Sequence, residues 1–169
     1  TLALAIAVAS ALRNLLGAAI QIKWPNDLVW HGQKIGGLLL EARTLSNQCQ
    51  VVFGIGLNYR LPDFFHLAHT WTDLATVLTD THLPPRNALA AQIINTCLPV
   101  LDSFPETGLT PYLPLWSALD ALAQRPITLL TPTDTVQGIA QGIDTHGALR
   151  VQVDGTEHRY QWGQVSVRY

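Results

Sequence analysis

The sequence is 169 residues long, and 48% of its residues are hydrophobic whereas only 13% are charged. Soluble domains typically have about 25% charged residues, so we expect much of this chain to be buried or to form interfaces. The length suits one ordinary domain, alone or with a small second one. A formal net charge of -2 argues against a basic surface, and we expect no nucleic-acid partner.

The first residues, TLALAIAVASALRNLLG, are almost all apolar and begin without Met. Arg13 and Asn14 interrupt this run before it reaches the roughly 20 residues of a membrane span. The basic leader and cleavage site of a secretory signal are not evident either. We therefore expect a buried helix over 2–16 that ends at Gly17, no membrane association, and a chain that is the C-terminal part of a longer protein.

The two cysteines, Cys49 and Cys97, lack the spacing of a metal or redox motif. The simpler interpretation is two free thiols in a reducing compartment, and a disulfide is the alternative. Free thiols without a secretory signal favour a cytoplasmic location.

The segment after Gly17 predicts an antiparallel sheet. Its apolar and β-branched runs are separated by short turns, the first of them with Gly32. Consecutive strands joined in this way form a meander, which favours an α+β fold over a repeated strand–helix–strand pattern. The expected strands cover residues 19–24, 27–30, 34–45 and 50–60.

Helical spacing of apolar residues is typical of the middle of the chain. Thr72 or Asp73 could cap a short helix. We expect Pro99 to kink or end the longest helix, because proline removes a backbone donor. The expected helices cover 74–80, 86–104 and 111–124, and the expected loop covers 60–70.

The last 45 residues change to short strands with turn sequences between them, such as THG and DGT. Five short strands with little room for a core predict a small SH3-like barrel docked on the larger domain. We therefore expect two domains, 1–124 and 125–169.

Lys34 begins a strand whose other residues are almost all apolar. A buried ammonium group needs an anionic partner, because an unpaired buried charge is costly. The alternative is that Lys34 lies at the strand end and its ammonium group reaches water. Its neighbours favour a ligand.

Two glycine pairs lie in neighbouring predicted strands, Gly36 with Gly37 and Gly54 with Gly56. Glycine weakens a strand, and its usual reasons are a bulge or the close approach of another group. Two pairs together indicate a flat patch of sheet on which a small flat molecule could lie. A bulge or helix packing is the alternative for either pair.

Four polar residues near these glycines could also bind a ligand. Asn26 and Asp27 follow a proline and could equally form a turn. Asp27 could pair with a lysine or help to hold Mg²⁺. Asn58 could end a strand or contact a nucleotide, and Lys23 could lie on the indole of Trp24. His66 and His69 are three residues apart without a third ligand nearby, so a metal site there is the weaker interpretation.

Taken together, KWPNDLVWHGQKIGGLLLEA and VVFGIGLNYR closely resemble the central signature of the biotin protein ligases (biotin–[acetyl-CoA-carboxylase] ligases). The tail, from QGIAQGIDTHGALRVQVDG to WGQVSVRY, resembles the C-terminal SH3-like domain of that family. The resemblance implies the mixed, largely antiparallel sheet of the class II synthetase and biotin–lipoate ligase fold. It also implies ATP, biotin and Mg²⁺ as cofactors or substrates.

The resemblance further implies a two-step reaction. Biotin and ATP give biotinyl-AMP and pyrophosphate, and biotin then passes to a lysine of a biotin carboxyl carrier protein. The resemblance implies that Lys34 and Asp27 are catalytic, and that Asp27 also binds Mg²⁺. It implies that ATP is bound by Asn26, Asn58 and Lys23. The residues that it implies for biotin are Lys34, Gly37, Leu38, Gly54 and Gly56. Family members often dimerise, so a homodimer is a further expectation.

The sequence departs from the family in one respect. The Gly-Arg-Gly-Arg loop that closes over biotinyl-AMP in the family does not occur in these 169 residues, and the family's helix-turn-helix domain is missing with it. Two hypotheses follow: a ligase that depends on this loop, or a catalytically incompetent fragment that binds ligand or carrier. A lipoate ligase shares the fold but not the KWPND block.

Overall fold

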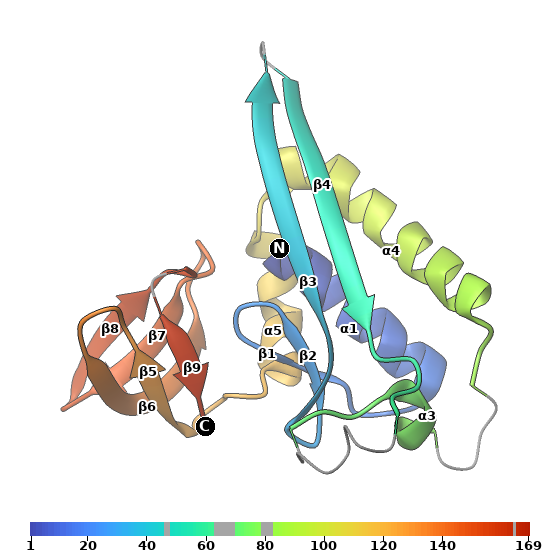
Figure 1. Ribbon diagram of the computed structural model, residues 1–169. Coiled ribbons are helices and arrows are strands. Elements are labelled where there is room, and N and C mark those ends of the chain that lie inside the picture. The colour runs from blue at the N-terminus through green and yellow to red at the C-terminus, as the bar shows by residue number, and fades with distance from the viewer. Residues whose placement is uncertain (46–47, 63–69, 79–82, 164) are drawn as a thin grey trace.

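The computed structural model describes residues 1–45, 48–62, 70–78, 83–163 and 165–169. Within these residues the chain forms a four-stranded sheet with helices, followed by a five-stranded sheet (Figure 1). This is the α+β fold that the sequence predicted, with a C-terminal β domain. His66 and His69 lie outside the described residues, and so does part of the loop expected over 60–70.

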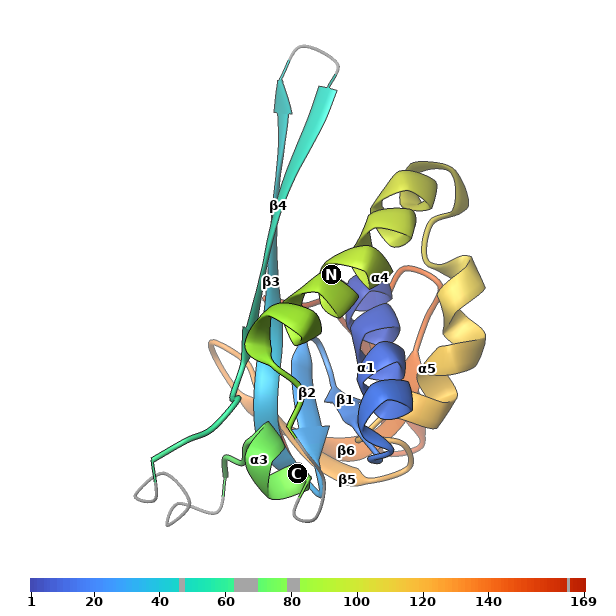
Figure 2. The same ribbon diagram turned by 90° about the vertical axis from the view of Figure 1, so that its right-hand side faces the viewer.

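Helix α1 runs Leu2–Leu16, as predicted, and Gly17 ends it with a left-handed φ of 62°. Glycine tolerates this conformation because it has no Cβ. Seven of the helix's apolar side chains are buried, as expected for a helix that is apolar on most of its surface. In Figure 2, α1 lies between α4 (Arg86–Thr107) and α5 (Leu113–Leu119) in the helix layer, and it contacts both.

The first sheet is an antiparallel meander, as the sequence predicted, with the strand order β1-β2-β3-β4. The long hairpin of β3 and β4 pairs Gly37 with Gly56 and Leu39 with Gly54. The strands are β1 (Gln21–Lys23), β2 (Asp27–Trp30), β3 (Gln33–Leu45) and β4 (Gln48–Leu57).

The described helices cover one face of this sheet. Figure 2 shows α1, α4 and α5 on the same side of the strands, and the strands β3 and β4 extend beyond these helices. The apolar core lies between the two layers and includes Ile6, Leu28 and Ile35, which are fully buried. Among the described residues, no helix covers the opposite face of this sheet (Figure 2).

Short segments after β4 bring the chain back beside β3. Asp73 caps α3 (Leu74–Val77) by accepting a hydrogen bond from the backbone N–H of Thr76, so Asp73 rather than Thr72 is the cap. A second carboxylate oxygen of Asp73 accepts from the N–H of Leu61. One aspartate therefore fixes both the helix start and the chain that leaves β4.

Helix α4 (Arg86–Thr107) corrects one expectation. It continues through Pro99 and Pro105, so of the two outcomes expected at Pro99, a kink or an end of the helix, the end is wrong. Cys97 and Val100, on either side of that proline, are buried where α4 packs on α1. The free energy gained by burying these side chains offsets the cost of the backbone hydrogen bond that proline cannot make.

The helix predicted over 111–124 is also shorter than expected. A 3₁₀ turn, η1 (Thr110–Tyr112), precedes α5 (Leu113–Leu119), and Asp120 then adopts extended backbone. Asp120 forms a parallel bridge with Ile22 of β1, and the N–H of Ala121 donates to the carbonyl oxygen of Ile22. The chain leaves the helix because it pairs with the sheet edge.

The C-terminal part forms five antiparallel strands in the order β8-β7-β6-β5-β9, close to the five that the sequence predicted. A buried hydrogen bond from Trp24 Nε1 to the carbonyl oxygen of Gly147, 3.0 Å long, ties this sheet to the first. The strands are β5 (Pro126–Leu130), β6 (Thr135–Ile143), β7 (Leu149–Val153), β8 (Thr156–Tyr160) and β9 (Ser166–Arg168). No helix in the described part of the chain has both the length and the hydropathy needed to cross a bilayer.

Candidate functional site

The open face of the first sheet carries a shelf that is nearly free of side chains. A Cβ added at Gly54 or Gly56 would meet no atom within 4 Å. Leu39, paired with Gly54, is 56% exposed on this face. We call this surface the glycine shelf; its lining residues are Asn26, Asp27, Lys34, Gly37, Leu38, Leu39, Gly54, Ile55 and Gly56.

An ion pair lies at one end of the glycine shelf. Lys34 Nζ is 2.5 Å from Asp27 Oδ1, and the two side chains are 32% and 26% exposed. A Cβ added at Gly37 would lie 3.2 Å from that carboxylate oxygen and 3.5 Å from Lys34 Nζ. Because Gly37 has no side chain, it leaves space for the ion pair. Both charged groups remain accessible to a ligand.

A β-bulge puts these groups on the same face. The register between β2 and β3 shifts by one residue, so that Val29 pairs with Lys34 whereas Leu28 pairs with Gly36. In a regular strand, residues three apart such as Lys34 and Gly37 point to opposite faces; the bulge, with Ile35 as the extra residue, brings them to the same face. The bulge was one of the alternatives for the glycines, and the structure shows that it serves the ion pair.

The two glycine pairs have different roles. A Cβ at Gly36 would collide with the carbonyl oxygen of Gly56 and lie 2.7 Å from Leu57 Cδ2, so packing between strands requires this glycine. Gly54 and Gly56 have no such constraint. Gly36 is therefore required by contact with the neighbouring strand and not by helix packing, and the open surface at Gly54 and Gly56 is what a ligand floor needs.

Leu38 lies differently from the other predicted biotin contacts. Its side chain is 3% exposed and belongs to the core, whereas Leu39 lies exposed on the shelf. The backbone of Leu38 is paired with Asn26, through Leu38 N–H to Asn26 O and Asn26 Nδ2 to Leu38 O. A contact of Leu38 with a ligand on the shelf would involve backbone atoms.

The two asparagines predicted to contact ATP, Asn26 and Asn58, also donate side-chain hydrogen bonds to backbone carbonyl oxygens. Asn58 Nδ2 donates to the carbonyl oxygens of Lys34, at 3.2 Å, and Thr72, at 3.0 Å. Asn26 Nδ2 donates to Leu38 O at 2.6 Å. The structure therefore gives both asparagines a role in fixing the strands that carry Lys34 and Asp27.

Lys23 lies beside the ion pair, because its backbone pairs with Asp27 across β1 and β2. Burial lowers the pKa of its ammonium group, and the positive charges of Arg168 and Lys34 act in the same direction while Asp27 opposes them. Lys23 and Lys34 are the two lysines of the whole sequence, and both lie at this site.

Trp71 is a candidate site residue that the sequence analysis missed. Lys34 Nζ lies 5.4 Å from the centre of its ring, and 40% of its surface is exposed. The N–H of Lys34 donates to Thr70 O and the N–H of Thr72 donates to Lys34 O, which aligns this segment with β3. An isolated tryptophan between unassigned residues gives little sequence signal, so only the fold reveals it.

Among the described residues, no group of three or more His, Cys, Asp or Glu side chains could hold a metal ion. Asp27 is thus a single carboxylate that is already paired with Lys34. A single carboxylate cannot form a metal site made of protein ligands alone. It suits Mg²⁺ that arrives bound to a nucleotide, because the phosphates then supply most of the oxygen ligands of the metal ion.

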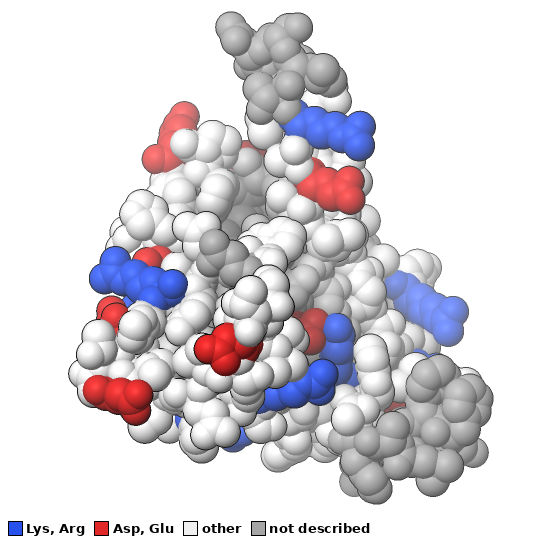
Figure 3. Space-filling view, turned by 60° about the vertical axis from the view of Figure 1, so that its left-hand side comes forward, with Lys and Arg blue, Asp and Glu red and all other residues white. Residues whose placement is uncertain are grey.

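Figure 3 shows that charged side chains are sparse on one face of the molecule, with acidic and basic groups close together near its middle.

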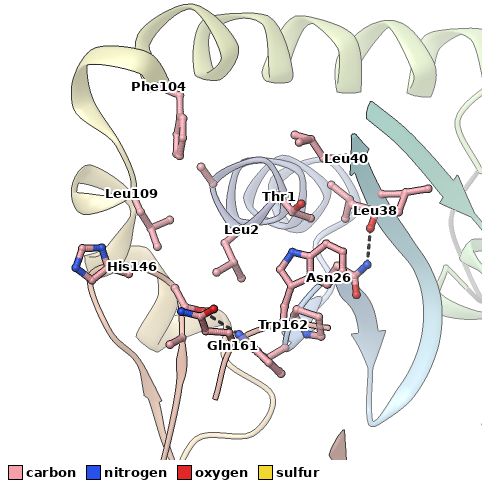
Figure 4. Close-up of a pocket in the computed structure, with 16 residues that line it drawn as sticks. Thr1, Leu2, Asn26, Leu38, Leu40, Phe104, Leu109, His146, Gln161 and Trp162 are labelled. Carbon is pink, nitrogen blue, oxygen red and sulfur yellow. Dashed lines mark hydrogen bonds between the residues drawn. The ribbon is translucent and has the colours of Figure 1, made fainter. Parts of the chain in front are cut away.

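A second cavity adjoins the glycine shelf and shares Asn26, Leu38 and Leu39 with it. Figure 4 shows Thr1 and Leu2 of the α1 end, Phe104 from α4, and Gln161 and Trp162 from the C-terminal part around this cavity. Most of its walls are apolar, and the cavity lies where the two parts of the chain meet.

Comparison with known proteins agrees with this architecture. The model of the Biotin/lipoate A/B protein ligase family matches residues 1–58, and that of the Biotin protein ligase C terminal domain matches residues 125–168. A crystal structure of biotin protein ligase from Aquifex aeolicus in complex with biotin and ATP matches with a TM-score of 0.83. That match has 20% sequence identity and covers 99% of this chain and 69% of the other, so it supports the fold alone.

Two curated relatives are similar in sequence. The bifunctional ligase/repressor BirA of Salmonella typhimurium is 33% identical over 173 residues, covering 99% of this chain and 52% of the relative. A biotin–[acetyl-CoA-carboxylase] ligase of Paracoccus denitrificans is 33% identical over 158 residues, covering 86% of this chain and 65% of the relative.

The fold and the matched models define an α+β ligase domain followed by a C-terminal β domain. More specifically, the chain belongs to the biotin protein ligase family. It spans about half the length of the curated relatives it matches.

Proposed function

We propose that this chain carries the glycine shelf and the catalytic lysine of an ATP-dependent biotin–protein ligase. Membership of the family supports the chemistry. The observation that carries the proposal is the glycine shelf, open at Gly54 and Gly56 and ending at the ion pair of Lys34 and Asp27. A compact fused-ring head with a carboxylate tail, as in biotin, has the shape and charge for such a surface.

Biotin lies on the shelf in this proposal. Its fused rings rest over Gly54 and Gly56, with the exposed Leu39 as an apolar neighbour. Its carboxylate reaches the ammonium group of Lys34, since a charge-assisted hydrogen bond is the strongest contact that the shelf offers. Glycine is needed because any longer side chain would occupy the place of the rings.

In the first step, the biotin carboxylate attacks the α-phosphorus of ATP and pyrophosphate leaves. Negative charge builds on the phosphate oxygens, and Lys34 stabilises it as a fixed cation. Lys23 contributes a second cation, Asn26 and Asn58 position the strands, and Mg²⁺ would enter with the nucleotide near Asp27. The exposed ring of Trp71 offers a stacking surface for the base.

In the second step, the amine of a lysine on a biotin carboxyl carrier protein attacks the carbonyl carbon of biotinyl-AMP. An amide forms and AMP leaves. We place this reaction in the cytoplasm, where ATP is plentiful and the free thiols of Cys49 and Cys97 stay reduced.

A second candidate function is binding without catalysis. Lys34 is the one cationic side chain that lines the shelf within the part of the chain that the structure describes. A transition state with a pentavalent phosphorus needs more positive charge than the ground state does. A chain with this shelf could therefore bind biotinyl-AMP or the carrier protein and yet turn over poorly.

Calorimetric titration of the chain with a sulfamoyl analogue of biotinyl-AMP tests the proposal. We expect saturable binding that Lys34→Ala weakens by about 10- to 100-fold, the effect of losing a hydrogen bond to a charged group. The matched control is Arg43→Ala, which removes an exposed cation from the same strand outside the shelf. Equal affinities of Lys34→Ala and the parent chain would contradict the proposal.

Release of pyrophosphate from ATP then separates the two candidate functions. A ligase releases pyrophosphate only when biotin is present, and Lys34→Ala slows this release. Tight binding of the analogue without any pyrophosphate would leave the non-catalytic function as the correct one.

A further inference from the structure

Tyr169 connects the C-terminal part to the turn that precedes Lys34. Its hydroxyl group donates a 3.2 Å hydrogen bond to the carbonyl oxygen of Gly32. His31 and Gly32 form the two-residue turn between β2 and β3, with left-handed φ angles of 48° and 80°. A residue from the far end of the sequence thus contacts the tightest part of the hairpin that carries the ion pair.

The ring of Tyr169 also lies against two cations from different parts of the chain. Lys23 Nζ is 5.1 Å from the ring centre, and the guanidinium carbon of Arg125 is 5.8 Å from it. Lys23 belongs to β1, and Arg125 directly precedes β5 of the second sheet. Cation–ring contacts of this kind are attractive, and together with the hydrogen bond to Gly32 they let one side chain join three segments.

Tyr169 contacts residues that lie next to the ion pair of Lys34 and Asp27 in the sheet. Lys34 follows Gly32 by two residues, before the bulge that turns it toward Asp27. Lys23 pairs with Asp27 on the other side of β2. Tyr169 therefore contacts residues on both sides of the ion pair without contacting Lys34 itself.

We propose that Tyr169 is a positioning residue, which holds Lys23 and the His31–Gly32 turn so that Lys34 and Asp27 stay in register for the ligand. Docking of the C-terminal domain thereby sets the geometry of a site built from strands of the first domain. The consequence for ligand affinity rests on the proposed function; the consequence for the geometry does not.

The pKa values of Tyr169 and Lys23 are both shifted by partial burial. Burial raises the pKa of the Tyr169 phenol, to which the carboxylate of Asp27 adds, while Arg125 acts in the opposite direction. Burial likewise lowers the pKa of Lys23. Removing the ring should therefore return the pKa of Lys23 toward its ordinary value of 10.5.

The first test uses nuclear magnetic resonance of the chain labelled with ¹³C at the lysine ε-carbon. Only two signals are expected, from Lys23 and Lys34, and Lys34→Ala assigns them. We expect Tyr169→Ala to raise the pKa of Lys23 and to shift the Lys34 signal, although Tyr169 does not contact Lys34. Tyr169→Phe keeps the ring, and so we expect it to leave the pKa of Lys23 nearly unchanged.

Hydrogen exchange of the same variants reports on the turn. Both Tyr169→Phe and Tyr169→Ala lose the hydrogen bond to Gly32, so amides near the turn should exchange faster than in the parent chain. Tyr160→Phe, a tyrosine of β8 in the same sheet, is the control and should match the parent. An unshifted Lys34 signal together with unchanged exchange in Tyr169→Ala would overturn the proposal. If Tyr169→Ala fails to fold, the exchange of Tyr169→Phe decides instead.

Affinity for the sulfamoyl analogue completes the test. We expect Tyr169→Ala to bind about tenfold more weakly than the parent and Tyr169→Phe to recover most of that loss. Unchanged affinity of Tyr169→Ala would show that the turn is held without any consequence for the site, and the positioning role would be wrong. A parent chain that does not bind would contradict the proposed function, while the lysine signals would still decide the role of Tyr169.

Discussion

Gly36 and Gly54 lie in the same hairpin but are glycine for opposite reasons. At Gly36 a methyl group would collide with the backbone of β4, whereas at Gly54 it would meet nothing. Strand residues are normally chosen for packing, so a strand glycine with empty space over it marks a surface kept free for another molecule.

Substitution of these two glycines should separate folding from binding. We expect Gly36→Ala to lower the free energy of unfolding by about 1–3 kcal/mol, the usual cost of overpacking. Gly54→Val should leave stability nearly unchanged, because β-branched residues suit strands, but should abolish binding of the biotinyl-AMP analogue. Urea denaturation and calorimetry measure the two effects. A stable Gly36→Ala, or a Gly54→Val that binds like the parent, would contradict this account.

At the residue scale, the sequence predicted which residues make up the candidate site but not the contacts between them. Lys34, Asp27 and the glycines were predicted from their types and spacing, and the structure brings them together. A bulge was one alternative for the glycines, but its position at Ile35 could not be predicted, because it depends on how β2 and β3 pair across the sheet. Trp71 was missed, since its place beside Lys34 depends on a contact between segments 37 residues apart in the sequence.

At the scale of elements, the segment 70–72 is held to β3 by a small set of hydrogen bonds. The backbone of Lys34 bonds to Thr70 and Thr72, and Asn58 Nδ2 bridges Lys34 O and Thr72 O. The buried Asp73 then begins α3. This segment carries Trp71 to the site although it contributes only an isolated bridge to the sheet.

Asn58→Ala should loosen this segment. Losing two hydrogen bonds at a partly buried position should lower the free energy of unfolding by about 1–3 kcal/mol. The amides of Lys34 and Thr72 should exchange faster, since their partners are no longer held. Asn87→Ala, at an exposed asparagine of α4, is the control and should change stability by less than about 0.5 kcal/mol. Unchanged exchange at Lys34 in Asn58→Ala would show that the backbone bonds suffice alone.

The elements themselves were largely predictable where local pattern decides. The helix over 2–16, the hairpin turn at Gly32 and the C-terminal strands follow from periodicity and turn residues. The predictions were wrong where packing overrides propensity. Helix α4 passes Pro99 because its apolar side chains pack on α1, and α5 ends early because Asp120 pairs with β1.

At the scale of the whole molecule, a buried carboxyl group lies where the two sheets are joined. Asp120 is 5% exposed and accepts hydrogen bonds from Trp116 Nε1 and the N–H of Leu122. Burial raises its pKa from the ordinary 3.8, and the two hydrogen bonds oppose that shift. The cleft beside it also holds Asp144, Arg150, Glu157 and Arg159.

The stability of the chain should therefore depend on pH through Asp120. Because its folded pKa is raised, the folded state binds the proton more tightly than the unfolded state does. Asp120 then contributes its full stability below pH 3.8, and this contribution is lost as pH rises through the folded pKa.

Urea denaturation of the parent chain and Asp120→Asn at several pH values measures this contribution. The free energy of unfolding of the parent, relative to the variant, should fall as pH rises from acid toward neutral. A difference that stays constant across this range would mean that the proton on Asp120 has no part in joining the sheets.

The sequence by itself determined the family and the fold class and predicted the residue types of the candidate site, because these depend on local patterns and on a specific block of residues. Only the tertiary structure decided which glycines face empty space, which amides serve as scaffold, and that Trp71 and Tyr169 lie beside the lysines. These features depend on strand register and on the docking of one part of the chain against another. Both arise from contacts between residues that are distant in the sequence, which composition and spacing do not encode.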